Sequence, residues 1–132
     1  MVEIRRLSPE QAWRQMQEEP ESLFLDVRDP IESAFVGQPT GAVNIPWKTA
    51  PTWEPNPGFV DQVRRLDSRL DRPIFLLCRS GQRSLDAALV LATAGYRDLT
   101  NVEEGFEGPL DSNKHRGTLG GWRYRGLPWE QS

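Results

Sequence analysis

The side chain best suited to chemistry in this sequence is Cys78, the only cysteine in the chain. A single thiol excludes an internal disulfide and a cluster of thiolate metal ligands, but it leaves one sulfur free to react. Arg79 and Arg83 follow within the next five positions, with Gly81 between them. Nearby cations favour the thiolate, which is the nucleophilic form of cysteine. The pattern therefore indicates a reactive thiolate or a small oxyanion site rather than an inert core thiol.

The residues on either side of Cys78 indicate how it is positioned. Residues 73–77 read Pro-Ile-Phe-Leu-Leu and lack polar alternation, as expected for a central strand buried on both faces. A helix is predicted from about Leu85 to Ala94, ending at Gly95. A short loop between a strand and a helix start gathers unpaired backbone N–H groups, and the helix dipole adds a positive field. We therefore expect the sulfur to lie in a cradle that favours negative charge.

The rest of the chain alternates strand and helix signals. Ser8, Pro9 and Gln11 form a capping-box helix start, and Pro20 ends that helix. A second helix is expected to begin at Asn56-Pro57 and to run to about residue 70. Strands are predicted at residues 2–6, 23–27, 42–45, 73–77 and 99–102. The alternation predicts an α/β fold with a central, mainly parallel sheet and helices on both faces.

The length of 132 residues fits one domain, which we expect to occupy residues 1–111. Residues 112–132 form a tail rich in glycine, arginine and polar residues, expected to be loosely ordered. Three apolar side chains in the tail could dock on the domain: Trp122, Leu127 and Trp129. Residues 46–58 are predicted to form an extended surface loop. Its indoles, Trp47 and Trp53, either pack on the domain or anchor a partner protein.

Charge and hydropathy restrict the partners and the compartment. The net charge of −3 gives no general attraction to nucleic acid or to acidic membrane surfaces. The longest apolar run, Ile74–Cys78, is far too short for a membrane span, and the N-terminus lacks the apolar run of a signal peptide. With one unpaired thiol, the sequence predicts a cytoplasmic protein with neither nucleic acid nor a membrane among its partners. No His, Cys or carboxylate spacing indicates a metal site.

Several ordered segments resemble the rhodanese-like domain family, specifically its single-domain bacterial members. The match spans about residues 3–110 and includes Gly95-Tyr96 and Asn101-Val102-Glu103-Glu104-Gly105-Phe106. Upstream it includes Asp26-Val27-Arg28, Glu32 and Gly41-Ala42-Val43-Asn44-Ile45-Pro46. Its active-site loop is similar to Cys78-Arg79-Ser80-Gly81-Gln82-Arg83-Ser84. One departure is Gly37-Gln38-Pro39-Thr40, where the family often has Gly-His-Ile, so the family's loop conformation is not carried over to this segment.

The resemblance implies a sulfurtransferase that carries a persulfide on Cys78 and needs no cofactor. The donor is a small sulfane anion such as thiosulfate, and the acceptor is cyanide or a thiol, with a sulfur-relay protein as a further candidate partner. The loop that binds the donor comprises Arg79, Ser80, Gly81, Gln82, Arg83 and Ser84. Asp26 and Arg28 are expected to support the fold around it. His115, the only histidine, lies in the tail and is a poor partner for Cys78.

Two other functions remain as alternatives. The first is a sulfur-carrier or regulatory protein-binding module, suggested by the two tryptophans of residues 46–58. The second is a cysteine phosphatase or arsenate reductase, because the same fold family includes both. Four residues separate Cys78 from Arg83, whereas the related phosphatases resemble a pattern with five. The shorter loop suits a sulfur atom better than a tetrahedral phosphate.

Overall fold

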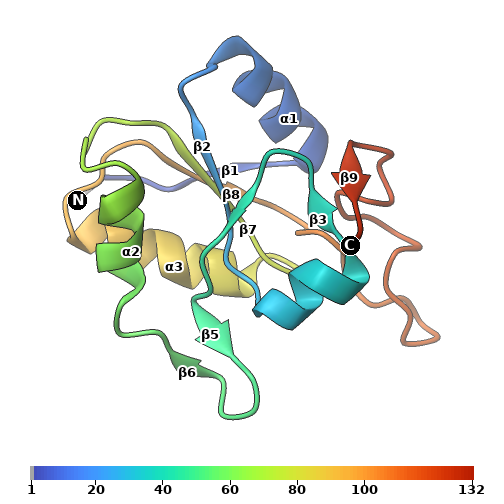
Figure 1. The fold of residues 1–132 in the computed structure, drawn as a ribbon. Helices are drawn as coiled ribbons and strands as arrows, with labels where there is room; N and C mark the ends of the chain where they lie inside the picture. Colours follow the sequence, from blue (N-terminus) through green and yellow to red (C-terminus); the bar gives the residue numbers. More distant parts are fainter. Residues whose placement is uncertain (1) are drawn as a thin grey trace.

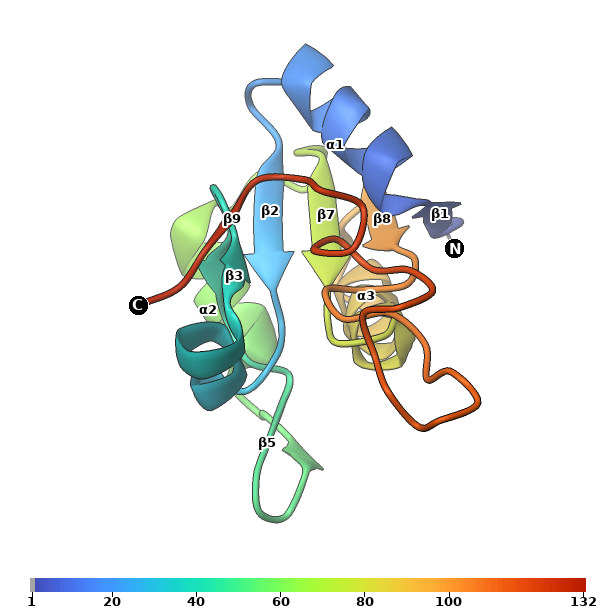
Figure 2. The same ribbon diagram turned by 90° about the vertical axis from the view of Figure 1, so that its right-hand side faces the viewer.

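Five parallel strands form the main sheet in the computed structural model, which describes residues 2–132. Their spatial order is β1-β8-β7-β2-β4, and Figure 2 shows β2, β7 and β8 side by side with arrowheads pointing the same way. The strands of this sheet are β1 (Arg5–Leu7), β2 (Leu23–Asp26), β4 (Val43–Asn44), β7 (Ile74–Leu77) and β8 (Leu99–Val102). Two small antiparallel sheets pair β3 (Gln38–Pro39) with β9 (Trp129–Glu130) and β5 (Lys48–Thr49) with β6 (Glu54–Pro55).

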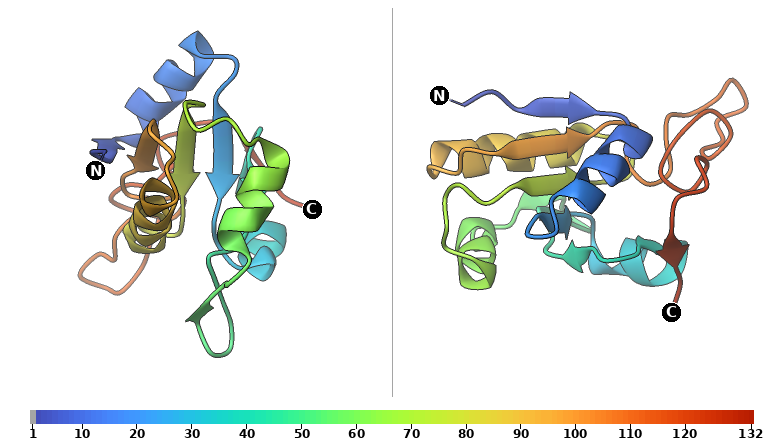
Figure 3. Two further views of the ribbon diagram at one scale, coloured as in Figure 1. Left: turned by 90° about the vertical axis from the view of Figure 1, so that its left-hand side faces the viewer. Right: turned by 90° about the horizontal axis from the view of Figure 1, so that it is seen from above.

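Helices cover both faces of this sheet (Figures 1 and 3). They are α1 (Pro9–Glu18), α2 (Phe59–Leu66), α3 (Gln82–Thr93) and a π-helix (Glu32–Val36). Along β7, Ile74 and Leu76 pack with α2 and α3, whereas Phe75 and Leu77 pack with α1 on the opposite face. Successive side chains of a strand point to opposite faces, so one unbroken apolar strand serves both cores. The predicted fold class, an α/β domain with a mainly parallel sheet, is confirmed.

The helix after Cys78 begins three residues earlier than predicted, at Gln82 rather than at Leu85. Its N-cap is Gly81, whose φ of 115° lies in the left-handed region that glycine adopts without strain. The backbone can therefore turn directly from the strand into the helix. As a result, Arg83 and Ser84 belong to the first turn of α3 and not to a free loop.

Residues 46–58 are more ordered than the predicted extended loop, because β5 and β6 pair as a hairpin. The two indoles of this segment differ in environment. Trp47 is buried, with its ring 5.4 Å from that of Phe59 on α2, whereas Trp53 at the hairpin turn is 46% exposed. The packing interpretation therefore holds for Trp47 alone. None of the helices formed by residues 2–132 has the length and apolar character needed to span a bilayer.

The tail is packed against the domain, so the expectation of loose order is wrong for the segment around Trp122. This indole is fully buried on the α1 side of the sheet, with its ring centre 5.7 Å from that of Trp13 and 5.2 Å from that of Phe24. Its Nε1–H donates to the carbonyl oxygen of Pro128 at 2.8 Å. Figure 2 shows the tail crossing the sheet before it pairs with β3. Of the three tail side chains that could dock, Trp122 is the fully buried one, because the burial of one large indole outweighs many polar neighbours.

Replacing Trp122 with alanine is expected to lower the free energy of unfolding by about 3–5 kcal/mol, because it removes a fully buried indole. Urea denaturation measures this loss. Tyr124→Ala is the matched control, since Tyr124 is an aromatic residue of the same tail but half exposed, and it should change stability by less than about 0.5 kcal/mol. Equal losses for the two variants would show that the tail is not part of the core.

Candidate active site

The reactive sulfur lies at the carboxyl end of β7, directly before the turn into α3. Cys78 is 1% exposed, and its Sγ accepts hydrogen bonds from the Gly81 backbone N–H at 3.1 Å and from the Ser84 hydroxyl at 3.3 Å. The N–H groups at the start of an α-helix have no intrahelical acceptor, and Gly81, the N-cap of α3, directs its N–H at the sulfur. The site therefore surrounds one sulfur atom with donors that stabilise negative charge.

A buried network controls the orientation of the Ser84 hydroxyl. Its oxygen lies within hydrogen-bond distance of Cys78 Sγ, of the Gly81 carbonyl oxygen and of Asn101 Oδ1. A hydroxyl carries one hydrogen, so Ser84 donates to only one of these acceptors at a time. Asn101 is itself fixed, because its Nδ2 donates to the Gly81 carbonyl at 3.1 Å and to Glu103 Oε2 at 2.7 Å. The shortest of the three distances is to Asn101 Oδ1, at 2.5 Å, and ionisation of Cys78 would draw the hydrogen to the sulfur, because a thiolate is the only charged acceptor of the three.

The two arginines of the loop have different surroundings. Arg83 forms a two-pronged ion pair with Glu32 of the π-helix, at 2.8 and 2.9 Å. Burial opposes the ionisation of both groups, but their hydrogen bonds and opposite charges outweigh it, so the pKa of Glu32 is lowered and that of Arg83 is raised. Arg79 is exposed, and no carboxylate of residues 2–132 forms an ion pair with it. Arg83 is therefore a partly neutralised cation, whereas Arg79 is free to meet an anion.

Asp26 and Arg28 lie beneath this region as a fully buried ion pair. The Arg28 guanidinium donates to both carboxylate oxygens of Asp26, at 2.9 and 2.7 Å, and to the Gly37 carbonyl at 2.6 Å. The Ser33 hydroxyl donates to Asp26 Oδ2 at 2.7 Å. The pair thereby ties the end of β2 to both ends of the π-helix that carries Glu32. A buried pair of this kind fixes geometry more than it adds stability.

Residues 105–107 support the Cys78 loop through backbone contacts. The Phe106 N–H donates to the Cys78 carbonyl at 2.8 Å, and the Glu107 N–H donates to the Arg79 carbonyl at 2.9 Å. Gly105 makes this approach possible, since its φ is +65° and a β-carbon there would lie 2.4 Å from the Cys78 carbonyl oxygen. Sequence reasoning placed Gly105 in the family resemblance but assigned it no role. A glycine soon after the last predicted strand, residues 99–102, was the available signal.

The remaining predicted loop residues lie on the surface. Ser80 and Gln82 are exposed, and the Gln82 side chain donates to Asp86 Oδ1 at 3.1 Å along α3. His115 is exposed in a turn of the tail, where its backbone N–H donates to Asp111. The arrangement thus brings Cys78, Gly81, Arg83 and Ser84 together and leaves the imidazole outside.

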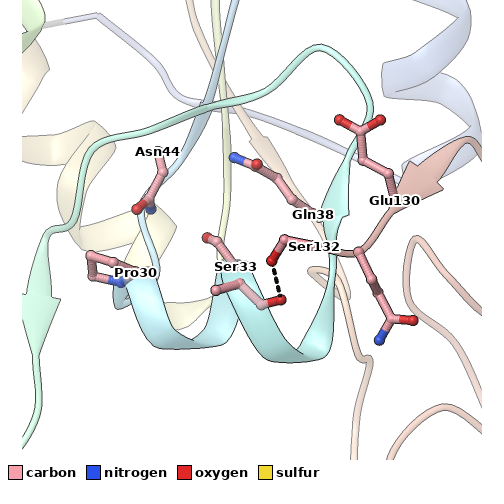
Figure 4. Close-up of a pocket in the computed structure, with 8 residues that line it drawn as sticks. Pro30, Ser33, Gln38, Asn44, Glu130 and Ser132 are labelled. Carbon is pink, nitrogen blue, oxygen red and sulfur yellow. Dashed lines mark hydrogen bonds between the residues drawn. The ribbon is translucent and has the colours of Figure 1, made fainter.

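Two hollows border this part of the molecule. One, of about 260 Å³, lies over the active-site loop and is lined by Lys48, Trp53, Arg79 and Arg83. The other, of about 370 Å³, is shown in Figure 4. Its lining includes one acidic side chain and no cationic one. The lining residues are Pro30, Ser33, Ala34, Gln38, Asn44, Glu130, Gln131 and Ser132. In the second hollow, the Ser132 hydroxyl donates to the Ala34 carbonyl at 2.9 Å. Only the first hollow joins cations to the reactive loop.

Comparison with known proteins relates this geometry to a family. A family model described as a rhodanese-like domain matches residues 8–110. Thiosulfate sulfurtransferase GlpE of Pseudomonas putida is 32% identical over 107 residues, which are 81% of this chain and 86% of that protein. The crystal structure of Rv0390 from M. tuberculosis is 38% identical, is covered over 100% of both chains and has a TM-score of 0.87. The protein RP600 of Rickettsia prowazekii is 40% identical over 76 residues; these are 57% of this chain and 56% of that protein, so the chain spans little more than half of its length.

Replacing Glu32 with glutamine is expected to destabilise the protein at pH 7 by about 2 kcal/mol, because Arg83 then loses its charged partner. The pKa of Glu32 is lowered by folding from its ordinary 4.5, so its contribution is complete above pH 4.5 and is lost as pH falls through the lower folded value. Urea denaturation from pH 7 to 3 should therefore show the two proteins converging at acid pH. A constant difference across this range would contradict the ion pair.

Proposed function

The chain belongs to the rhodanese-like domain family, and from this premise we propose that it is a sulfurtransferase that carries sulfur as a persulfide on Cys78. The observation that carries the proposal is the convergence of the Gly81 N–H and the Ser84 hydroxyl on Cys78 Sγ. A nucleophilic sulfur held by donors needs no separate general base, because the thiolate is already stabilised. This agrees with the position of the only histidine, which is exposed in the tail.

The reaction proceeds in two displacements. The Cys78 thiolate attacks the outer sulfur of an anionic donor such as thiosulfate; a new S–S bond forms, the donor's S–S bond breaks, and its electron pair leaves with sulfite. Cyanide or a thiolate then attacks the outer sulfur of the Cys78 persulfide. The S–S bond to the protein breaks and the electron pair returns to Cys78 as a thiolate. The first-turn N–H groups of α3 hold the negative charge of both sulfur species.

The donor approaches through the exposed cation. Arg79 has no ion-pair partner within residues 2–132, so an incoming anion is its natural counter-charge. Arg83 supplies a fixed positive field, since Glu32 holds its guanidinium in place. Asp26 and Arg28 serve the reaction indirectly, by fixing the π-helix from which Glu32 projects. Residues 1–111 thus carry the reacting groups, while the segment 112–132 completes the core.

Phosphate or arsenate chemistry is less compatible with this loop. A tetrahedral oxyanion needs several donors around it, including the guanidinium of the loop arginine. Here the Arg83 guanidinium is already occupied by both carboxylate oxygens of Glu32. The four residues between Cys78 and Arg83 also give a smaller loop than the five of the related phosphatases. A single outer sulfur atom suits this space better.

A sulfur-carrier role with a protein donor or acceptor is the second candidate. It is favoured by exposed apolar side chains on the π-helix, at its N-cap and on the hairpin, because such residues commonly anchor interfaces. Ile31 is 63% exposed, Phe35 is 77% exposed and Trp53 is 46% exposed. In either role the reaction belongs in the cytoplasm, where a lone thiol stays reduced. Mass spectrometry of protein isolated from cells distinguishes the roles through a disulfide between Cys78 and a partner protein, which only a carrier retains, since a Cys78 persulfide is expected in both.

The direct test is replacement of Cys78 by alanine. Thiocyanate formation from thiosulfate and cyanide should fall to the uncatalysed rate, because the nucleophile is gone. The domain should remain folded, with a loss of about 1 kcal/mol in urea denaturation for removing one buried sulfur. Cys78→Ser is the control that keeps the side-chain size, and it should be equally inactive. Turnover by either variant comparable to that of the unaltered protein would refute the proposal.

A further inference from the structure

The hollow over the active-site loop is built by two segments that are distant in sequence. Arg79 and Arg83 come from the loop and from α3, whereas Lys48 and Trp53 come from the hairpin of β5 and β6. Three of the four lining residues are cations, and the fourth is an indole. Neither Lys48 nor Arg79 is in an ion pair with a carboxylate of the described chain. The hollow therefore combines unneutralised positive charge with an aromatic surface.

The hairpin is held in place by the same residues that orient the loop. The Ala50 N–H donates to Asp29 Oδ2 at 2.8 Å, and the Asp29 N–H donates to Glu32 Oε1 at 3.2 Å. Glu32 in turn binds Arg83, whose guanidinium carbon lies 5.4 Å from the centre of the Trp53 ring. This contact is within the range of a cation–π interaction. The indole thus contacts Arg83 and is half exposed where it lines the hollow.

Trp53 has a backbone conformation that is unusual for a bulky residue, and the turn itself does not require an indole. Its φ is +57°, in the left-handed region where glycine or asparagine is favoured and a bulky residue is strained. Such strain persists where the surrounding structure fixes it, and it is concentrated at functional sites. A glycine would serve the turn at lower cost. A strained backbone that carries a half-exposed indole beside the active-site loop favours a role for Trp53 in the hollow.

The size of the hollow exceeds what an inorganic donor requires. A volume of about 260 Å³ approaches the lower end, about 300 Å³, of the pockets that bind small organic ligands. Thiosulfate has only five heavy atoms, and it has no apolar surface to lie against an indole. A donor that carries an organic group beside its anionic sulfur matches both the spare volume and the aromatic wall.

We propose that this hollow makes the protein selective for organic sulfane donors, thiosulfonates or persulfides whose organic group lies against Trp53 while Lys48 and Arg79 bind the anionic end. The inference presupposes the sulfurtransferase activity proposed above and names its substrate class. With a thiosulfonate, the Cys78 thiolate attacks the terminal sulfur and forms the persulfide S–S bond. The bond between the terminal sulfur and the sulfonyl sulfur breaks, and its electron pair leaves with the sulfinate.

The test compares benzenethiosulfonate with thiosulfate on the unaltered protein and on Trp53→Ala, measuring kcat/KM for persulfide formation. Comparing the same two donors on both proteins cancels the difference in their leaving groups. The ratio of kcat/KM for benzenethiosulfonate to that for thiosulfate should fall about tenfold in Trp53→Ala, the factor that one aromatic contact supplies. Tyr124→Ala, which removes a half-exposed aromatic residue of the tail, is the matched control and should keep the ratio.

Three outcomes are distinguishable. A fall of the ratio in Trp53→Ala alone supports the selectivity. An unchanged ratio in Trp53→Ala, with both donors active on both proteins, overturns it and leaves the sulfurtransferase proposal standing. Failure of every donor to persulfidate Cys78 in the unaltered protein overturns the proposed function and the inference together. Persulfides of small thiols extend the test, and they should show the same dependence on Trp53 when the thiol carries an aromatic group.

Discussion

A buried sulfur atom, which we propose carries negative charge in the reaction, is the constraint on which the rest of this structure depends. A charged group excluded from water is costly unless donors replace the lost solvent. Cys78 is 1% exposed, and the Gly81 N–H and Ser84 hydroxyl replace water around its Sγ. Both donors depend on α3 beginning immediately after the loop, which in turn depends on the left-handed conformation of Gly81. The strand, the glycine and the helix start thus act together to place hydrogen-bond donors at a buried sulfur.

The surrounding ion pairs keep the end of β7, the Cys78 loop and the start of α3 rigid. They do not add to the charge of this segment. The Asp26–Arg28 pair fixes the π-helix, the π-helix places Glu32, and Glu32 holds Arg83. The same Glu32 accepts a hydrogen bond from the Asp29 N–H, and Asp29 binds the hairpin through the Ala50 N–H. Arg79 and Arg83 form a single cationic cluster in the sequence, but in the structure they have different roles. Arg83 is a positioned, paired cation, and Arg79 is the one exposed to an incoming anion.

The sequence was informative where the signal was local. The unbroken apolar run at residues 73–77 and the glycine at position 81 predict a buried strand and a tight turn, and the structure has both. The capping box at Ser8 is also present, with both of its reciprocal hydrogen bonds. The pairing of Arg83 with Glu32 spans 51 positions, and no local pattern identifies such a partner. Trp122 was one of three tail side chains expected to be able to dock, but its partners Trp13 and Phe24 lie far away in the sequence, so no local pattern distinguished it from the other two.

The position of the outer sulfur in the persulfide tests the central claim most directly. A high-resolution crystal structure of the thiosulfate-treated protein measures it, because the added atom is electron-rich and bonded to a well-fixed residue. We predict one additional sulfur on Cys78 Sγ, lying within hydrogen-bond distance of backbone N–H groups from the first turn of α3. An unmodified Cys78 after exhaustive treatment, or an outer sulfur directed away from these N–H groups, would contradict the account.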